Sequence, residues 1–261
     1  MAEYSGVVAG GEGISAADAN VEQHHIAQSI ALHLLPGIAA TIIYALVTPA
    51  LMTQGFPPLF SAYLVLAGAI IVLELGFLFY RGRTRNGRLS LQGIVLYREP
   101  MPVGQYFIFV PLLLVWGVII TGLASPADSL LTKVLSSWLP DWYLFNDLPQ
   151  YPTLYNHQLF LALVIVGFIF NGIAGPITEE LYFRGYLLPR ISRFGRWAPV
   201  INTVLFSLYH FWAPGQFISR TLLLLPVVSS VWLKRNIYLG MIVHCLLNTI
   251  SVIGVATLLL K

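Results

Sequence analysis

The sequence predicts an all-α fold, a polytopic transmembrane helix bundle of about seven spans, within a range of six to eight. Three observations lead to this fold class. Of the 261 residues, 57% are hydrophobic and 10% are charged, whereas soluble domains carry about 25% charged residues. The mean hydropathy is +0.77. Apolar runs near the length that crosses a bilayer also recur along the chain.

Seven apolar runs approach the length of about 20 residues that a transmembrane helix needs. We expect helices because lipid offers no partner to backbone N–H and C=O groups, and because the alternation typical of a barrel strand is absent. The fifth run is short and Pro226 interrupts the sixth, so these two are candidates for half-spans or kinked helices. The runs cover residues 30–52, 61–80, 104–123, 157–175, 198–212, 217–233 and 237–260.

The basic residues predict the orientation of the bundle. Eleven of the 14 Lys and Arg residues fall in the segments 81–98, 184–196 and 234–235. An alternating path of seven spans brings these segments to one side, which the positive-inside rule identifies as the cytoplasm. The N-terminus is therefore predicted to be cytoplasmic, with residues 1–25 as a mobile tail, and the C-terminus to lie on the far side.

The composition also excludes several classes of protein. A single cysteine, Cys245, excludes a disulfide framework and a cysteine zinc cluster. The N-terminus lacks the basic-then-apolar layout of a cleaved signal peptide. We expect an integral, multi-pass protein of a bacterial inner membrane or a eukaryotic endomembrane, with the lipid bilayer as its partner and no nucleic acid.

Polar residues at membrane depth are the candidates for function. A charge at the centre of a bilayer costs about 2.5–3.5 kcal/mol on insertion scales, so such residues are usually paired or functional. A rise of about 1.5 Å per residue puts Glu179, His210 and His244 roughly 13–20 Å from the basic residues that end their helices. Three separate helices are thus predicted to bring a carboxylate and two imidazoles to one layer.

Helical spacing predicts how these side chains point. Glu180 and Arg184 are four residues apart, so they share a helix face and can form an ion pair. Glu179 is rotated by about 100° from Glu180 and can point elsewhere. His244 and Asn248 are also four apart, so both can face one cavity.

Hydrolysis is the simplest chemistry that suits this set of groups. Glu179 can take a proton from water and pass it to a leaving amine. His210 can hold that water or share the proton. His244 and Asn248 can donate hydrogen bonds to the developing oxyanion.

Three short motifs then point to a known family. The chain reads "EELYFR" at Glu179–Arg184, "FSLYH" at Phe206–His210 and "HCLLN" at His244–Asn248. In these residues it resembles the CAAX protease and bacteriocin-processing (CPBP, or Abi) family, whose motifs are EExxxR, FxxxH and HxxxN and which includes type II CAAX prenyl endopeptidases. The resemblance covers about residues 157–250. It implies an endopeptidase that acts on membrane-associated or lipidated protein substrates.

The resemblance also implies a role for each matching residue and a division of the chain. Residues 157–261 would form the catalytic core, and residues 26–156 would supply N-terminal helices and a far-side interfacial loop. Glu179 and His210 would activate water, His244 and Asn248 would form the oxyanion hole, and Glu180 and Arg184 would be a supporting pair.

We expect a glutamate-dependent mechanism without a bound cofactor. The chain has no HExxH motif. The zinc pattern of three protein ligands plus water would be met only by combining residues scattered along the chain. A zinc metalloprotease is the alternative, since the family was long classed that way.

Two other functions and several isolated polar residues complete the predictions. A proton-linked transporter is one alternative, because proton relays also use membrane-embedded Glu and His residues. A catalytically idle scaffold or immunity-like protein is another. Glu74 is expected to pair with a basic group or line the cavity, His33 and His157 to be interfacial, and Arg220 to extend outward to the membrane surface.

Overall fold

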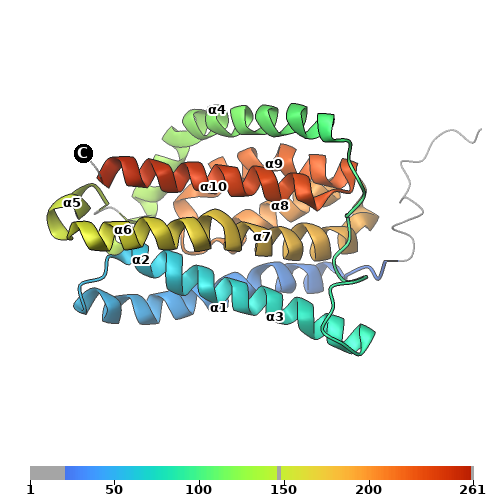
Figure 1. The fold of residues 1–261 in the computed structure, drawn as a ribbon, viewed down its shortest axis with the longest axis horizontal. Coiled ribbons are helices and arrows are strands. Elements are labelled where there is room, and N and C mark those ends of the chain that lie inside the picture. The colour runs from blue at the N-terminus through green and yellow to red at the C-terminus, as the bar shows by residue number, and fades with distance from the viewer. Residues whose placement is uncertain (1–20, 146–147, 260–261) are drawn as a thin grey trace, which may run out of the picture.

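The structure, a computed structural model, describes residues 21–145 and 148–259. It confirms the all-α bundle: long helices lie side by side along one direction, and the described residues form no strand (Figure 1). Of the predicted tail over residues 1–25, only the last five positions are described, and the rest lies outside the described residues.

In the part of the chain that the structure describes, six helices are long and apolar enough to cross a membrane, by length and composition. The short fifth run forms α8 (Trp197–Tyr209), which has 13 residues and is too short to span alone. Three of the spans contain stretches of π- or 3₁₀-helix. The spans are α1 (Ile26–Thr53), α2 to α3 (Pro58–Ser61, Ala62–Leu66 and Ala67–Asn86), α4 (Val103–Leu135), the helix from α6 through α7 (His157–Phe194), α9 with its preceding turn (Pro214–Gln216 and Phe217–Lys234) and α10 (Ile237–Leu259).

The predicted runs mark the apolar parts of these helices, and several helices continue beyond them. The third run ended at residue 123, whereas α4 reaches Leu135, and the fourth ended at residue 175, whereas the helix reaches Phe194. An apolar run marks only the part of a helix that lies in the hydrocarbon layer. Beyond that layer, polar residues can continue the same helix. Short turns, Asp141–Tyr143, Leu148–Gln150 and α5 (Tyr151–Leu154), lie between α4 and α6.

Individual side chains set where helices begin and end. The side chain of Asn156 accepts a hydrogen bond from the backbone N–H of Leu159 at 2.9 Å, and Asn236 does the same for Leu239 at 2.9 Å. These N-caps satisfy amides that a helix start leaves unpaired. Gly87 ends α3 in the left-handed conformation, at φ +70°, which glycine adopts without steric cost.

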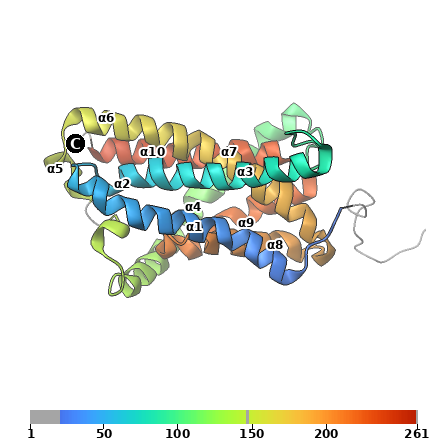
Figure 2. The ribbon, with the colours of Figure 1, turned by 90° about the horizontal axis from the view of Figure 1, so that it is seen from below.

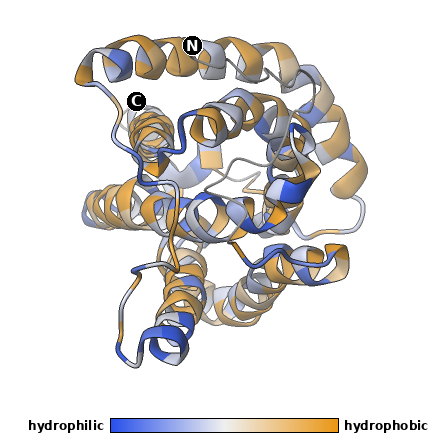
Figure 3. Ribbon diagram, turned by 90° about the vertical axis from the view of Figure 1, so that its right-hand side faces the viewer, coloured by the Kyte–Doolittle hydropathy of each residue, from blue (hydrophilic) through white to orange (hydrophobic). Residues whose placement is uncertain are grey.

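The outward faces of the bundle are apolar. Phe107, Leu46 and Val72 are 78%, 74% and 71% exposed, and apolar residues dominate the helices when the bundle is viewed end-on (Figure 3). A soluble protein rarely exposes such continuous apolar surface, so these faces fit lipid. The ionisable side chains of Glu74, Glu180 and Arg184 are instead fully buried inside the bundle.

The three basic segments lie at one end of the bundle, as the alternating path predicts. The connection from α3 to α4 crosses this end (Figure 1). Within it, the Leu96 N–H donates to the Gly185 carbonyl at 2.8 Å. The Tyr97 carbonyl accepts from the N–H of Ile237, the first residue of α10, at 2.8 Å. This connection therefore joins the start of α10 to the helix that carries Gly185.

Helix α1 packs closely against α8 (Figure 2). A Cβ at Gly37 would meet the backbone oxygen of Tyr209, so only glycine permits this approach. The same packing buries His33, which accepts from the Asn202 amide at 3.0 Å and donates to the Ser29 carbonyl at 2.7 Å. The prediction of an interfacial His33 is wrong, because α8 covers this part of α1. His157 is exposed at the first residue of α6.

Candidate active site

The helix that carries the glutamate pair is irregular around it. The Gly175 N–H donates to the Phe170 carbonyl, five residues earlier, and a Cβ at position 175 would lie only 2.8 Å from that oxygen. Pro176 has no N–H to donate, which favours a break in the regular pattern. Such widened turns occur frequently at functional sites. The π-helical segments are Gly167–Ala174 and Glu180–Leu187, on either side of α7 (Gly175–Glu179).

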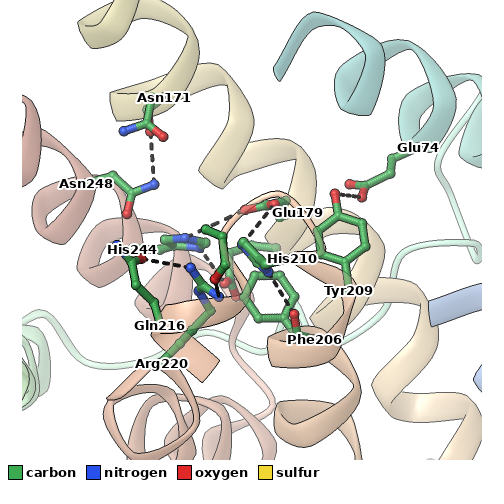
Figure 4. Close-up of polar contacts among 12 residues, drawn as sticks. Glu74, Asn171, Glu179, Phe206, Tyr209, His210, Gln216, Arg220, His244 and Asn248 are labelled. Carbon is green, nitrogen blue, oxygen red and sulfur yellow. Dashed lines mark hydrogen bonds and ion pairs between the residues drawn. The ribbon is translucent and has the colours of Figure 1, made fainter. Parts of the chain in front are cut away.

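Glu179 lies between two histidines from other helices (Figure 4). Its Oε1 is 3.9 Å from His210 Nε2, and its Oε2 is 3.7 Å from His244 Nε2. The glutamate is only 5% exposed. Both separations are too long for a direct hydrogen bond and suit a bridging water. The structure thus brings together the carboxylate and the two imidazoles that the sequence placed in one layer.

His210 is oriented by the end of its own helix. It follows the last residue of α8, and its Nδ1 lies 2.8 Å from the Phe206 carbonyl. A carbonyl only accepts hydrogen bonds, so Nδ1 carries the proton. In the neutral ring, Nε2 then presents a lone pair toward Glu179. A carbonyl that the helix end leaves unpaired therefore fixes both the tautomer and the direction of this side chain.

His244 contacts both glutamates. Its Nδ1 is 3.0 Å from Glu180 Oε1, and its Nε2 faces Glu179. An ionised carboxylate only accepts, so Nδ1 donates to Glu180. Nε2 can donate a hydrogen bond only when both ring nitrogens carry protons.

Glu180 and Arg184 form the ion pair that their spacing predicts. Glu180 Oε1 lies 3.3 Å from Arg184 Nη1, and both side chains are fully buried. The guanidinium carbon of Arg184 also lies 4.0 Å from the centre of the Phe206 ring, a cation–π contact. Gly240 on α10 leaves the space for this carboxylate, since a Cβ there would meet Glu180 Oε2.

Asn248 lies beside this cluster and contacts another helix. Its side-chain amide donates to the Asn171 carbonyl at 3.0 Å (Figure 4). Within residues 21–145 and 148–259, no hydrogen bond joins it to Glu179 or to either histidine. An asparagine amide has two N–H donors, so one remains for a ligand.

A second buried carboxyl group, which the motifs do not include, supports the site from behind. Glu74 on α3 accepts a hydrogen bond from the Tyr209 hydroxyl at 2.7 Å and is fully buried. Its partner is therefore a phenol rather than a basic group. The Tyr209 ring packs edge-on against the His210 ring, with centroids 5.0 Å apart. Glu74 thus helps to hold the residue that borders His210.

Arg220 departs from its prediction. Instead of extending outward, it donates to Gln216 Oε1 at 2.9 Å and to the Ala213 carbonyl at 3.4 Å, both in the turn that follows His210. The short α8 returns the chain at membrane depth, so the first turn of α9 lies beside the site (Figure 4). There the guanidinium interacts electrostatically with Glu179.

Some of these additional residues carry a signal in the sequence and others do not. Gly240 precedes His244 by four residues, so both lie on one face of α10 and the glycine was readable as a contact point. Glu74 and Tyr209 are 135 positions apart, and no local pattern pairs them.

A bound zinc ion is the alternative to the glutamate-dependent mechanism. No group of three or more His, Cys, Asp or Glu side chains among the described residues is arranged to hold a metal ion. Structural and catalytic zinc sites need three or four such ligands at about 2.0–2.3 Å from the ion. The mechanism considered below uses protein groups and water.

Comparison with known proteins agrees with the motifs. Residues 160–250 match the family described as "Type II CAAX prenyl endopeptidase Rce1-like". This match supports the family that the three motifs indicate, and with the six apolar helices it supports a membrane-embedded protease of the CAAX type. Searches of curated proteins and of solved structures found no match.

The buried ion pair generates a prediction about stability. Glu180→Gln should lower the free energy of unfolding by about 3–5 kcal/mol, because it leaves the Arg184 charge buried without a carboxylate. The double variant Glu180→Gln/Arg184→Met should recover much of this loss, since it removes the unpaired charge. Thermal unfolding of the purified protein in detergent measures both.

Glu99→Gln is the matched control. Glu99 lies 3.9 Å from Arg235, but its side chain is 56% exposed, and exposed pairs contribute at most about 1 kcal/mol. A double variant no more stable than Glu180→Gln alone would show that the pair is not what holds this part of the bundle.

Proposed function

We propose that the site around Glu179 hydrolyses a peptide bond near the C-terminus of lipidated, membrane-associated proteins. The observation that carries this proposal is a buried carboxylate whose two oxygens lie 3.9 and 3.7 Å from the Nε2 atoms of two histidines on separate helices. That arrangement can hold a water molecule and remove a proton from it. Residues 157–261 form the catalytic core in this proposal, and residues 26–156 support it.

The first step is the attack of water on the scissile carbonyl. A water between Glu179 and His210 donates one hydrogen bond to the carboxylate and the other to the lone pair of His210 Nε2. As its oxygen bonds to the carbonyl carbon, the carboxylate of Glu179 takes the proton. The C=O electron pair moves to oxygen, which gives a tetrahedral oxyanion.

The oxyanion needs hydrogen-bond donors that are already in place. The remaining amide N–H of Asn248 is one, and Nε2–H of a His244 ring that is protonated on both nitrogens is the other. When the intermediate collapses, the C–N bond breaks and the proton on Glu179 passes to the leaving nitrogen. The immediate products are a carboxylic acid and an amine, and Glu179 returns to its ionised state. The acid then passes its remaining proton to the amine, which leaves a carboxylate and an ammonium group.

Glu180 and Arg184 act indirectly in this scheme. Glu180 accepts from His244 Nδ1 at 3.0 Å and so fixes the direction of Nε2. Arg184 balances the charge of Glu180 and packs on Phe206, whose ring contacts His210 with centroids 4.7 Å apart. The pair therefore positions both imidazoles without touching the substrate.

In this proposal Arg220 binds the terminal carboxylate of the substrate, which favours substrates that are cut near the C-terminus. A CAAX sequence ends the chain, so its terminal carboxylate lies at most about 14 Å from any bond within the four residues. Arg220 interacts electrostatically with Glu179, and it donates hydrogen bonds to the neutral oxygens of Gln216 and Ala213. A guanidinium binds a carboxylate through paired, charge-assisted hydrogen bonds.

The first prediction concerns the proposed base. Glu179→Gln should lower the turnover of a farnesylated CAAX peptide by about a hundredfold or more, the range that general acid–base catalysis supplies. Glu74→Gln is the matched control, because it also neutralises a buried glutamate but keeps an oxygen that accepts from Tyr209. It should retain turnover. The purified protein in detergent and an internally quenched peptide are sufficient for the assay.

If Glu179→Gln cleaves the peptide at the wild-type rate, the mechanism is wrong. If neither protein cleaves it and Glu179→Gln instead blocks proton-coupled uptake in vesicles, the transporter is the better interpretation.

The second prediction concerns Arg220. The wild-type protein should cleave a peptide with a free C-terminal carboxylate about 10–100 times more efficiently than the same peptide amidated, which is the effect of one charged hydrogen-bonded pair. Arg220→Gln should remove this preference by slowing the acid and leaving the amide unchanged. Equal slowing of both peptides would assign Arg220 to the charge balance of Glu179 alone.

A further inference from the structure

A separate pocket lies at the basic end of the bundle. Its volume is about 560 Å³, and it is formed between the last turns of α3, the connection from α3 to α4 and the 3₁₀-helical segment Leu188–Phe194. None of the proposed catalytic residues lines it. Its charged lining residues are Glu22, Arg81, Arg85 and Arg190.

The charges of this pocket are unbalanced. Three guanidinium groups face one carboxylate, Glu22, which lies 3.3 Å from Arg81. The Glu22 side chain is 70% exposed, and such surface pairs are weak enough for another anion to replace them. Burial, with Arg190 nearby, lowers the pKa of the adjacent His24 to about 4, so this ring adds no positive charge at neutral pH.

Two of the arginines are held in position by the protein itself. Arg190 is only 3% exposed, donates to the Tyr186 carbonyl at 2.7 Å and lies 3.8 Å from the centre of the Tyr186 ring. Its Nε has no hydrogen-bond partner among the described residues. Arg85 donates to the Gly93 carbonyl through Nη1 at 2.7 Å. Since a guanidinium has five N–H donors, both keep donors for a ligand.

This arrangement selects a particular ligand chemistry. Fixed guanidinium groups match the planar pairs of oxygens that a phosphate group presents. The pocket also has apolar lining, from Ile94 and Leu96. It lies at the end of the bundle that the basic residues assign to the cytoplasmic surface, where anionic headgroups are concentrated and where basic pockets between transmembrane helices bind them.

We propose that this pocket binds a phosphate group, and that the group belongs to the headgroup of an anionic phospholipid. The lipid would stabilise the connection between α3 and α4, which carries Ile94 and Leu96. Because the Leu96 N–H donates to the Gly185 carbonyl, that connection in turn braces the helix segment of Glu180 and Arg184. The proposal concerns binding and is independent of the peptidase chemistry.

The experiment uses the full chain in nanodiscs of phosphatidylcholine, with and without phosphatidylglycerol. Thermal unfolding reports stabilisation, and native mass spectrometry reports phosphatidylglycerol that stays bound. The pocket variant is Arg81→Gln/Arg85→Gln. The matched control is Arg83→Gln/Arg88→Gln, which removes the same charge from exposed positions in the same segment that do not line the pocket.

Phosphatidylglycerol should stabilise the wild-type protein and the control, and the pocket variant should bind it about tenfold more weakly or worse. Equal weakening in both variants would overturn the proposal, because surface charge would then suffice. Inorganic phosphate that stabilises the protein as well as phosphatidylglycerol does would assign the pocket to a soluble anion and reject the lipid.

A second variant guards against misfolding of the first. Thr84 lines the pocket, so Thr84→Glu places a carboxylate there without removing an arginine. It should also abolish the retention of phosphatidylglycerol. Normal retention by Thr84→Glu would contradict the proposal.

Discussion

The buried ion pair between Glu180 and Arg184 is the interaction on which the rest of the structure depends. Neither charge is tolerated alone in a low-dielectric interior, so each requires the other at 3.3 Å. Their neighbours follow from this requirement: Gly240 leaves room for the carboxylate, Phe206 covers the guanidinium, and His244 donates to Glu180. Glu179, the residue before Glu180, is thereby directed toward the imidazoles of His244 and His210.

The sequence predicted those features of the fold that depend on the lipid bilayer around the protein. Apolar length identified the spans, and basic residues identified the end where three segments meet, because both respond to the bilayer directly. The spacing of four residues predicted the pair of Glu180 and Arg184, because residues that far apart share one face of a helix. His33, Arg220 and the Glu74–Tyr209 contact needed knowledge of which helices adjoin. The position of the short α8 explains all three contacts. It covers His33 on α1, it places Tyr209 opposite Glu74 on α3, and it brings the start of α9, with Arg220, beside the site.

The candidate site and the basic pocket are linked through one irregular helix. Its π-helical turns position the two glutamates, and its 3₁₀-helical end carries Arg190 into the pocket. The connection from α3 to α4 contacts this helix through both Gly185 and Arg190. A headgroup at the membrane surface would therefore stabilise the same helix that supplies the proposed base, without lying near the substrate.

The central claim is that water, activated by Glu179, attacks the peptide bond directly. Single-turnover cleavage by unlabelled protein in H₂¹⁸O tests it. The account predicts one ¹⁸O atom in the carboxylate formed in the first turnover. An unlabelled product carboxylate would contradict it, because the oxygen would then have come from the side chain of Glu179 through a covalent intermediate.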